Sequence, residues 1–231
     1  MSIWQVGYIV RAVPRTRRAV AVKAGHPAES PRAQARQARE EVYREHVLAA
    51  AEKVFAEEGF EAAKLLDISR RSGLSMGSIY ALFSGKEQIY EAINDRHAAE
   101  LLALIRAIVA RGDDPLVTLE ALASAYIDYF HAHPDFLRMQ VRTGTAWALA
   151  TQTPGARGAL AREIHDLQTS IFARGVAARI FFDEDPSYLG FLFTGMDEIH
   201  LAQWVAGGMR EPREELRARF LKIVRRTFVR S

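Results

Sequence analysis

The chain has 231 residues, of which 49% are hydrophobic and 26% charged, so it is long enough for one small and one larger domain with separate cores. It contains no cysteine, which excludes disulfide frameworks, thiolate metal sites and cysteine nucleophiles. The net charge of +3 is too small to indicate a partner, and no apolar run approaches the roughly 20 residues that cross a bilayer, so we expect a cytoplasmic protein without a membrane segment.

The first segment, residues 1–30, is basic and has no regular pattern. Five Arg or Lys residues stand against one acid, Glu29, and Pro14 and Pro27 interrupt any periodicity. We expect a disordered extension that the fold does not need, or one that arises from a start codon placed too early.

A long helix is expected to follow. Ser30 and Pro31 suit the N-cap and the first helical position, and Gly59 suits the C-terminal end. An apolar stripe at helical spacing begins only at Val47. Before the stripe, three arginines fall on nearly one face, where they would contact phosphates or remain in solvent: Arg32, Arg36 and Arg39.

Two short helices with a very tight turn between them come next. The first carries Leu65 and Ile68 on its apolar face, and the second carries Ile79 and Phe83. Only Gly73, Leu74 and Ser75 separate them, with the glycine as a C-cap and the serine as an N-cap. A turn this short predicts a helix-turn-helix, whose second helix enters a DNA major groove. Residues 84–87 are predicted to form a capping box for a fourth helix.

The same stretch is similar to a known family. Its motifs, in order, are Gly59-Phe60, Asp67-Ile68, Gly73-Leu74-Ser75, Gly77-Ser78-Ile79-Tyr80, Phe83 and Lys86-Glu87. Residues 45–94 with these motifs resemble the DNA-binding domain of the TetR/AcrR family of transcriptional repressors. The resemblance implies an all-α fold with a helix-turn-helix DNA-binding domain over residues 31–94 and a larger helical effector-binding and dimerisation domain over residues 95–231.

The resemblance also implies which residues meet DNA. Tyr80 is expected in the major groove and Lys86 at a phosphate. Separately from the resemblance, residues 1–30 could form an arm that contacts phosphates or the minor groove, as an alternative to a dispensable extension. Ala63, Leu66 and Leu82 replace polar residues of the family pattern, which predicts fewer polar contacts with DNA. Met76 and Leu66 are expected to make apolar contact with thymine methyls. The candidate DNA-binding residues are Ser75, Met76, Gly77, Ser78, Tyr80, Lys86, Leu66 and Leu82.

Proline, glycine and aspartate residues mark the expected helix ends in the rest of the chain. The fourth helix is expected to continue to Gly112, and Asp114 with Pro115 begins the next helix. Proline and glycine pairs then separate five segments, without a phosphate loop or a nucleophile elbow. The pairs are His133-Pro134, Pro154-Gly155, Asp185-Pro186, Gly207-Gly208 and Glu211-Pro212.

Aromatic and polar residues of these helices are candidates for an effector pocket. Asp197, Glu198 and His200 interrupt an apolar helix, and a polar group on a buried face needs a partner from another helix, a second subunit or a ligand. The two histidines of His131-Ala132-His133 are expected at a helix C-terminus and not at a metal. The candidate pocket residues are Tyr126, Phe130, Phe136, Met139, Trp147, Phe172, Phe193 and Asp197.

The last two helices, by the same resemblance, are expected to form a four-helix bundle with their copies in a homodimer. The predicted interface residues are Leu189, Leu192, Met196, Ile199, Gln203, Leu216, Phe220, Ile223 and Phe228.

The sequence as a whole predicts a homodimeric DNA-binding repressor that a small, mainly apolar ligand releases from an inverted-repeat operator, without a cofactor or metal. The alternatives are a small helical enzyme that uses Asp197 and His200, and a DNA-binding protein that responds to no ligand.

Overall fold

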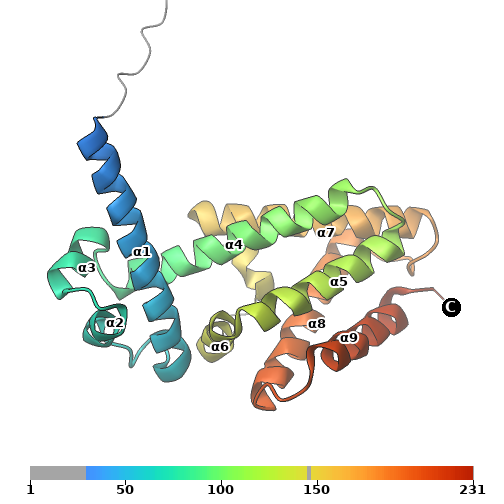
Figure 1. Ribbon diagram of the computed structural model, residues 1–231. Coiled ribbons are helices and arrows are strands. Elements are labelled where there is room, and N and C mark those ends of the chain that lie inside the picture. Colours follow the sequence, from blue (N-terminus) through green and yellow to red (C-terminus); the bar gives the residue numbers. More distant parts are fainter. Residues whose placement is uncertain (1–29, 145–146, 231) are drawn as a thin grey trace, which may run out of the picture.

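The computed structural model of the chain describes residues 30–144 and 147–230, and its regular structure there is helical except for one isolated bridge between Phe181 and Val229. This confirms the predicted all-α fold (Figure 1). The predicted extension lies outside the described residues, apart from Ser30. In chain order the elements are α1 (Pro31–Glu58), α2 (Leu65–Ser72), α3 (Met76–Leu82), α4 (Lys86–Ala110), α5 (Pro115–Ala132), α6 (Pro134–Thr143), the 3-10 helix η1 (Trp147–Gln152), α7 (Gly155–Ala177), α8 (Pro186–Ala206) and α9 (Arg213–Phe228).

The first three helices form a small unit, the head, around one apolar core. Phe55 from α1, Ile68 from α2 and Ile79 from α3 are fully buried together with Phe83. The helix ends are those that the sequence predicts: Ser30 and Ser75 accept hydrogen bonds as N-caps, and Gly59 and Gly73 end α1 and α2 with φ of 82° and 72°. Such positive φ angles are inexpensive only for glycine.

The predicted capping box before α4 is wrong by one residue. The N-cap is Gly85, which has no side chain to accept a hydrogen bond. Gln88 therefore stands at the third helical position in place of Glu87, and its Oε1 accepts a hydrogen bond of 2.6 Å from the backbone N–H of Ser84. This bond reaches the residue before the N-cap, so neither half of a capping box is formed.

The remaining helices, α4 to α9, form the body. Figure 1 shows α4 running from the head along the body, with α5, α8 and α9 on one side of it, and α4 packs against α7. Helix α1 also packs against α6, so the head and the body share a continuous core. The domain boundary expected at residue 94 thus falls in the middle of α4.

The predicted breaks separate the body helices, and two turns were not foreseen. Helix α6 ends at Gly144, which has a left-handed conformation, before η1 begins. After α7 the chain turns so that Phe181 lies on Gly175, where a Cβ would come within 2.0 Å of the Phe181 ring. Among the described residues no helix is both long and apolar enough to span a membrane.

Four of the predicted interface residues belong instead to the core of the single chain. Leu189 of α8 and three residues of α9 are fully buried, because α9 packs its apolar stripe against α5. Ion pairs from Arg217 to Asp128 and from Arg225 to Glu120 fix this packing. An apolar stripe has the same period whether it meets its own chain or a copy, so the sequence could not separate the two cases. The three α9 residues are Leu216, Phe220 and Phe228.

The other predicted interface residues remain accessible. Leu192 and Met196 are half-buried, whereas Ile199, Gln203 and Ile223 are exposed.

Candidate functional site

Helix α3 presents an exposed outer face on a fixed base. Its inner residues Ile79 and Phe83 are buried, and the Oγ of Ser69 closes the preceding turn by donating to the carbonyl of Leu74 at 2.6 Å. On the outer side Tyr80 is 56% exposed. Ser75 and Gly77 are also exposed, and Met76 is half-buried. The helix can therefore enter a groove without any loss of core packing.

Two residues near the tip have local partners. The hydroxyl of Ser78 lies 2.9 Å from that of Ser75, whose Oγ also accepts from the Ser78 N–H, so this pair is engaged in capping. The carbonyl of Leu82 accepts a hydrogen bond of 3.3 Å from Arg44, and the Arg44 guanidinium lies 4.4 Å from the centroid of the Phe83 ring. Leu82 is half-buried and Leu66 is 46% exposed on α2. The sequence analysis missed Arg44, which braces the end of α3.

Lys86 has a different environment from the one expected of a phosphate contact. Its Nζ donates to the backbone carbonyls of Phe60 at 2.9 Å, Glu61 at 3.0 Å and Ala63 at 3.5 Å, and it lies 4.7 Å from the centroid of the Phe60 ring. An ammonium group has three donors, and all three are used here. Lys86 therefore ties the loop between α1 and α2 to the start of α4.

The first half of α1 projects from the head (Figure 1). The helix has 28 residues, about 42 Å at helical rise, and its buried stripe begins only at Val47. Arg32, Arg36 and Arg39 are exposed on the projecting half, where Arg36 makes a solvent-exposed ion pair with Glu40 at 3.5 Å. This half presents cations beside the helix-turn-helix and carries no core packing.

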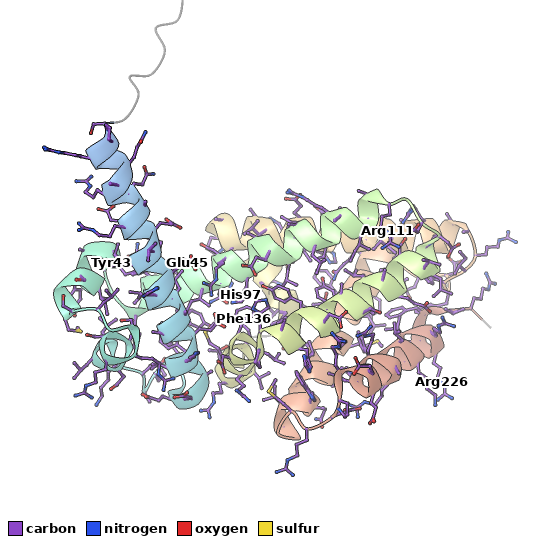
Figure 2. All side chains as sticks on the ribbon, viewed as in Figure 1. Tyr43, Glu45, His97, Arg111, Phe136 and Arg226 are labelled. Atoms are coloured by element: carbon purple, nitrogen blue, oxygen red, sulfur yellow. The ribbon has the colours of Figure 1, made fainter. Side chains whose placement is uncertain are left out.

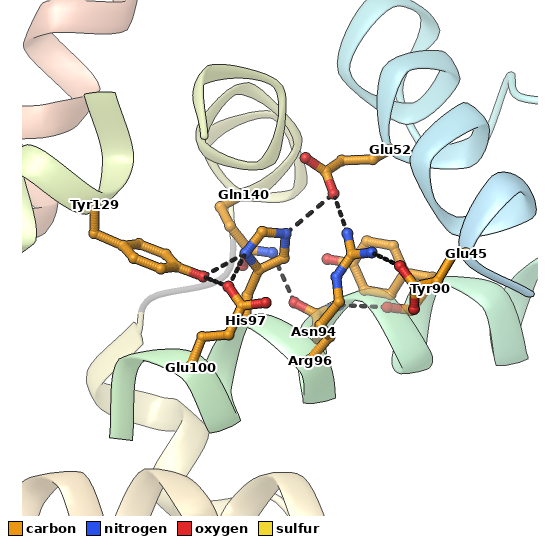
Figure 3. A network of polar contacts seen from close by, with 9 residues as sticks. All are labelled: Glu45, Glu52, Tyr90, Asn94, Arg96, His97, Glu100, Tyr129 and Gln140. Atoms are coloured by element: carbon orange, nitrogen blue, oxygen red, sulfur yellow. Dashed lines mark hydrogen bonds and ion pairs between the residues drawn. The ribbon is translucent and has the colours of Figure 1, made fainter. Parts of the chain in front are cut away.

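Head and body are joined by a buried polar cluster, which we call the joint (Figure 3). The Oε2 atom of Glu52 on α1 accepts from Arg96 at 2.8 Å and lies 3.0 Å from Nε2 of His97, both on α4. The other ring nitrogen of His97 lies 2.6 Å from the hydroxyl of Tyr129 on α5, which donates to Glu100 at 2.7 Å. Each polar group in this low-dielectric position has a partner, so the joint holds three helices in one arrangement.

The charge of Glu52 is favoured by the joint. Burial alone would raise the pKa of Glu52, but the hydrogen bond from His97 and the charges of His97 and Arg96 outweigh it and lower the pKa below its ordinary value of 4.5.

Four rings connect the joint with the interior of the body. His97 stacks on Phe136 with 3.7 Å between ring centroids and an interplanar angle of 10°, and Figure 2 shows these two residues beside each other. Phe136 is nearly parallel to Phe130, and Phe130 stacks on Trp147 at 5.0 Å. The last three of these rings belong to the wall of a cavity.

The cavity has a volume of about 150 Å³ and lies among α4, α5, α6, η1, α7 and α8. Its wall is mostly apolar, with a few polar groups. The structure places on this wall five of the eight candidate pocket residues: Tyr126, Phe130, Phe136, Trp147 and Asp197. The other three are absent from it and are buried in the core: Met139, Phe172 and Phe193. Phe172 and Phe193 pack on Phe228 and on each other, and Phe193 also lies next to Tyr126 of the cavity wall.

The three polar residues of α8 have three different environments. His200 donates from Nε2 to the backbone carbonyl of Leu216 on α9 at 3.0 Å, because a carbonyl can only accept. Glu198 accepts from the backbone N–H of Trp147 at 3.0 Å. Asp197 is 2% exposed and its Oδ1 has no hydrogen-bond partner in the described part of the chain. Asp197 and His200 thus face different neighbours and do not form an acid–base pair.

The two histidines at the end of α5, His131 and His133, contact different neighbours. His131 stacks on Trp204 and His133 packs against His97 and Tyr129. Burial, followed by the charge of His97, lowers the pKa of His133.

Several functional candidates escaped the sequence analysis although a pattern for them existed. Glu52 interrupts the buried stripe of α1, and His97 stands on the buried side of α4. Asn94, Gln140 and Gln168 are buried polar residues on the cavity wall. A polar residue at a core position is the feature that could have identified all five.

A three-residue turn between two short helices, a buried inner face and an exposed outer face on the second helix define a helix-turn-helix protein. Residues 47–93 match the family model described as "Bacterial regulatory proteins, tetR family". This match confirms the resemblance predicted from the sequence: residues 47–93 are a DNA-binding domain of the TetR family of transcriptional regulators.

Comparison with known proteins gives partial matches. The chain is 33% identical over 86 residues to the HTH-type transcriptional activator FasR of Mycolicibacterium smegmatis, a match over 37% of this chain and 39% of FasR. It is 37% identical over 81 residues to the HTH-type transcriptional repressor KstR2 of Rhodococcus jostii, over 35% of this chain and 40% of KstR2. The match therefore spans about two-fifths of the length of each relative.

A solved structure extends the likeness of the fold. The transcriptional regulator FadR from Bacillus subtilis in complex with stearoyl-CoA superposes with a TM-score of 0.64 at 15% identity, over 77% of this chain and 95% of FadR. At this identity the likeness concerns the fold alone.

The contacts of Lys86 lead to a stability prediction. Lys86→Met keeps the length of the side chain but removes three charge-assisted hydrogen bonds, so we expect the free energy of unfolding to fall by about 1–2 kcal/mol. Urea denaturation measures it, with Lys53→Met, an exposed lysine of α1, as the control. Unchanged stability together with a smaller salt dependence of DNA affinity would instead support the phosphate contact.

The joint leads to a pH prediction. Glu52→Gln should lower the free energy of unfolding at pH 7 by about 1–3 kcal/mol, because it leaves Arg96 and His97 without their shared anion. Since the pKa of Glu52 is lowered in the fold, its stabilisation is complete above the ordinary value of 4.5 and is lost as the pH falls through the lowered value.

The difference between the wild type and Glu52→Gln should therefore shrink in urea denaturation as the pH falls below 4.5. Glu57→Gln on the same helix is the control, because Glu57 pairs with Arg71 in solvent and its loss should leave stability nearly unchanged. A difference that is constant with pH would contradict the role given to the Glu52 charge.

Proposed function

We propose that the chain is a homodimeric transcriptional regulator of the cytoplasm that binds an inverted-repeat operator through α3 and is released by a small, mainly apolar effector in the body cavity. The observation that carries the proposal is the exposed outer face of α3, with Tyr80 at its centre, on a helix whose inner face is locked in the core.

The DNA contacts follow from this face. Tyr80 and Met76 are the groove residues, and the backbone at the start of α3 approaches DNA where Gly77 carries no side chain. Arg32, Arg36 and Arg39 on the projecting half of α1 supply phosphate contacts that do not depend on sequence. Lys86 contributes by holding the loop and not by touching a phosphate.

The dimer contact is assigned to the outward face of α8. Tyr188, Leu192 and Ile199 recur there at helical spacing, and Ile199 is 66% exposed in the single chain. A large exposed apolar residue in a row with others is typical of a protein interface. On α9 only the exposed Ile223 remains of the stripe that the sequence suggested.

The effector site is assigned to the cavity, whose wall is mostly apolar. The structure of FadR in complex with stearoyl-CoA makes acyl-CoA esters one class of effector to test. Cavities near 150 Å³ hold a group of about the size of benzene, so a longer effector requires the cavity to widen or to continue outward.

The cavity and the joint are connected by the stack of Trp147, Phe130, Phe136 and His97. An effector that displaces Phe136 moves the ring on which His97 rests, and His97 holds Glu52 of α1. To shift the equilibrium, the effector must bind the arrangement that has lost DNA more tightly than the one that holds DNA. The separation of the two heads in the dimer then changes, and simultaneous contact with both half-sites is lost.

The alternative of a ligand-independent DNA-binding protein is less well supported, because such a protein would not need a cavity beside the joint. The enzyme that uses Asp197 and His200 conflicts with the separate environments of these residues.

Selection of duplexes from a random pool, followed by affinity measurement, tests DNA binding. We expect an inverted repeat with half-sites about one helical turn apart or somewhat more. Tyr80→Ala should weaken specific binding by about 1–3 kcal/mol, because it removes a groove contact and no core packing. Leu149→Ala, which is equally exposed at 56% but lies in η1, is the control. Retained operator preference in Tyr80→Ala would make Tyr80 dispensable for recognition.

The dimer is tested by sedimentation. Ile199→Asp should convert the dimer into a monomer, because it places a charge in the apolar contact of α8. Val117→Asp, at an exposed position at the start of α5, should leave the dimer intact. Equal behaviour of the two variants would exclude the outward face of α8 as the interface.

A further inference from the structure

Asp197 is a buried carboxyl group at the wall of an otherwise mostly apolar cavity. It is 2% exposed, its Oδ1 makes no hydrogen bond among the described residues, and it belongs to the lining of the cavity. An unpaired polar group at such a position is costly to the fold. A group that costs stability in this way is better explained by binding a ligand than by supporting the fold.

Tyr126 offers a hydrogen-bond donor on the same wall. Its hydroxyl oxygen accepts from Nε2 of Gln168 at 3.1 Å, and Oε1 of Gln168 accepts from Thr194 at 3.2 Å. The Tyr126 oxygen thus accepts a hydrogen bond from the Gln168 amide, and the hydroxyl proton of Tyr126 is free to be donated to another group. Burial, followed by the influence of Asp197, raises the pKa of Tyr126, so its hydroxyl keeps its proton. Both side chains belong to the wall of the same cavity.

Three other polar side chains on the cavity wall already have partners. Asn94 donates to the Tyr90 carbonyl and accepts from Gln140 at 2.7 Å, so these two amides are engaged with each other and with the backbone. His165 is held by Ser187 at 2.9 Å.

A hydroxyl group matches this pair of side chains. It accepts one hydrogen bond and donates one, so its oxygen can accept from Tyr126 while its proton goes to Asp197. A hydrocarbon would leave both groups unpaired. Burial raises the pKa of Asp197 well above its usual value, which favours a neutral carboxyl group, and the carbonyl oxygen of a neutral carboxyl still accepts a hydrogen bond from a hydroxyl. An ammonium group could bind Asp197 but could not accept from Tyr126.

We infer that, within the proposed effector cavity, Tyr126 and Asp197 together bind the hydroxyl group of an uncharged, mainly apolar effector. The volume of about 150 Å³ suits a ring of the size of benzene, so a simple hydroxylated ring is the smallest molecule that fills the site. The same pair rejects hydrocarbons of equal shape, because a binding site built for a hydroxyl leaves its own polar groups unpaired when the hydroxyl is missing.

The test uses phenol and toluene, which have nearly the same shape and differ by a hydroxyl and a methyl group. Binding to the full chain without DNA is followed by protein-observed NMR titration up to a few millimolar. We expect phenol to bind about three- to tenfold more tightly than toluene, the effect of one net hydrogen bond. Equal affinities, tighter binding of toluene, tighter binding of benzylamine, or no binding of phenol would each overturn the inference.

Variants assign the preference to the two side chains. Tyr126→Phe and Asp197→Leu should each reduce the ratio of the phenol and toluene affinities to near one, and Asp197→Leu should bind toluene more tightly than the wild type does. Ile164→Val changes the volume of the same wall but not its polarity, so it should leave the ratio unchanged. A full phenol preference in Asp197→Leu would overturn the role of Asp197. If Asp197→Leu does not fold, the test rests on the wild type and Tyr126→Phe: the ratio of phenol to toluene affinity must be above one in the wild type and near one in Tyr126→Phe.

This test separates the inference from the function on which it rests. Phenol preference without operator binding would refute the proposed regulator and leave the hydroxyl site in place. Operator binding that other effectors release, without phenol preference, would refute the hydroxyl site alone.

Discussion

The carboxylate of Glu52 is the constraint on which the arrangement of the two halves depends. It is a charge inside the apolar contact between α1 and α4, and it is tolerated because Arg96 and His97 supply two donors to one oxygen. A buried ion of this kind contributes less to net stability than to specificity, since any other angle between the helices would leave at least one charge unpaired. The head is therefore set on the body at one orientation, and the exposed face of α3 is fixed with it.

The ring stack gives this constraint a connection to the cavity. The rings of His97, Phe136, Phe130 and Trp147 follow one another from the joint to the cavity wall in a densely packed interior, where small changes of volume are felt by neighbouring groups. The cavity wall also carries polar residues that do not belong to the joint, and Phe136 borders both the wall and the joint.

The sequence predicted the helices and their ends well, because caps are local: Ser30, Ser75, Gly59 and Gly73 act within one turn of the chain. The side to which an amphipathic helix turns is not local, and here the sequence was less informative. Phe220 and Phe228 were assigned to a partner chain, whereas they fill their own core. Five of the eight pocket candidates line the cavity, and three lie in the core. The sequence could not separate the two groups, because a large residue on a buried face has the same sequence pattern whether it borders a cavity or another side chain. The contacts of Lys86 could not be predicted, because its partners lie in a loop about 25 residues earlier in the chain, and helical periodicity does not describe how a loop folds back.

The continuity of α4 across head and body limits how regulators of this kind can be recombined. A chimera joined at residue 94 would take Glu52 from one parent and Arg96 with His97 from the other, and any parent without matching donors would strand the carboxylate in the interior. Moving the junction toward Ala110 keeps the joint intact but transfers part of the cavity wall, including Ala98 and Leu101, with the head. The helix-turn-helix and the cavity wall are therefore not separable modules in this chain, and exchange of one requires redesign of α4, which they share.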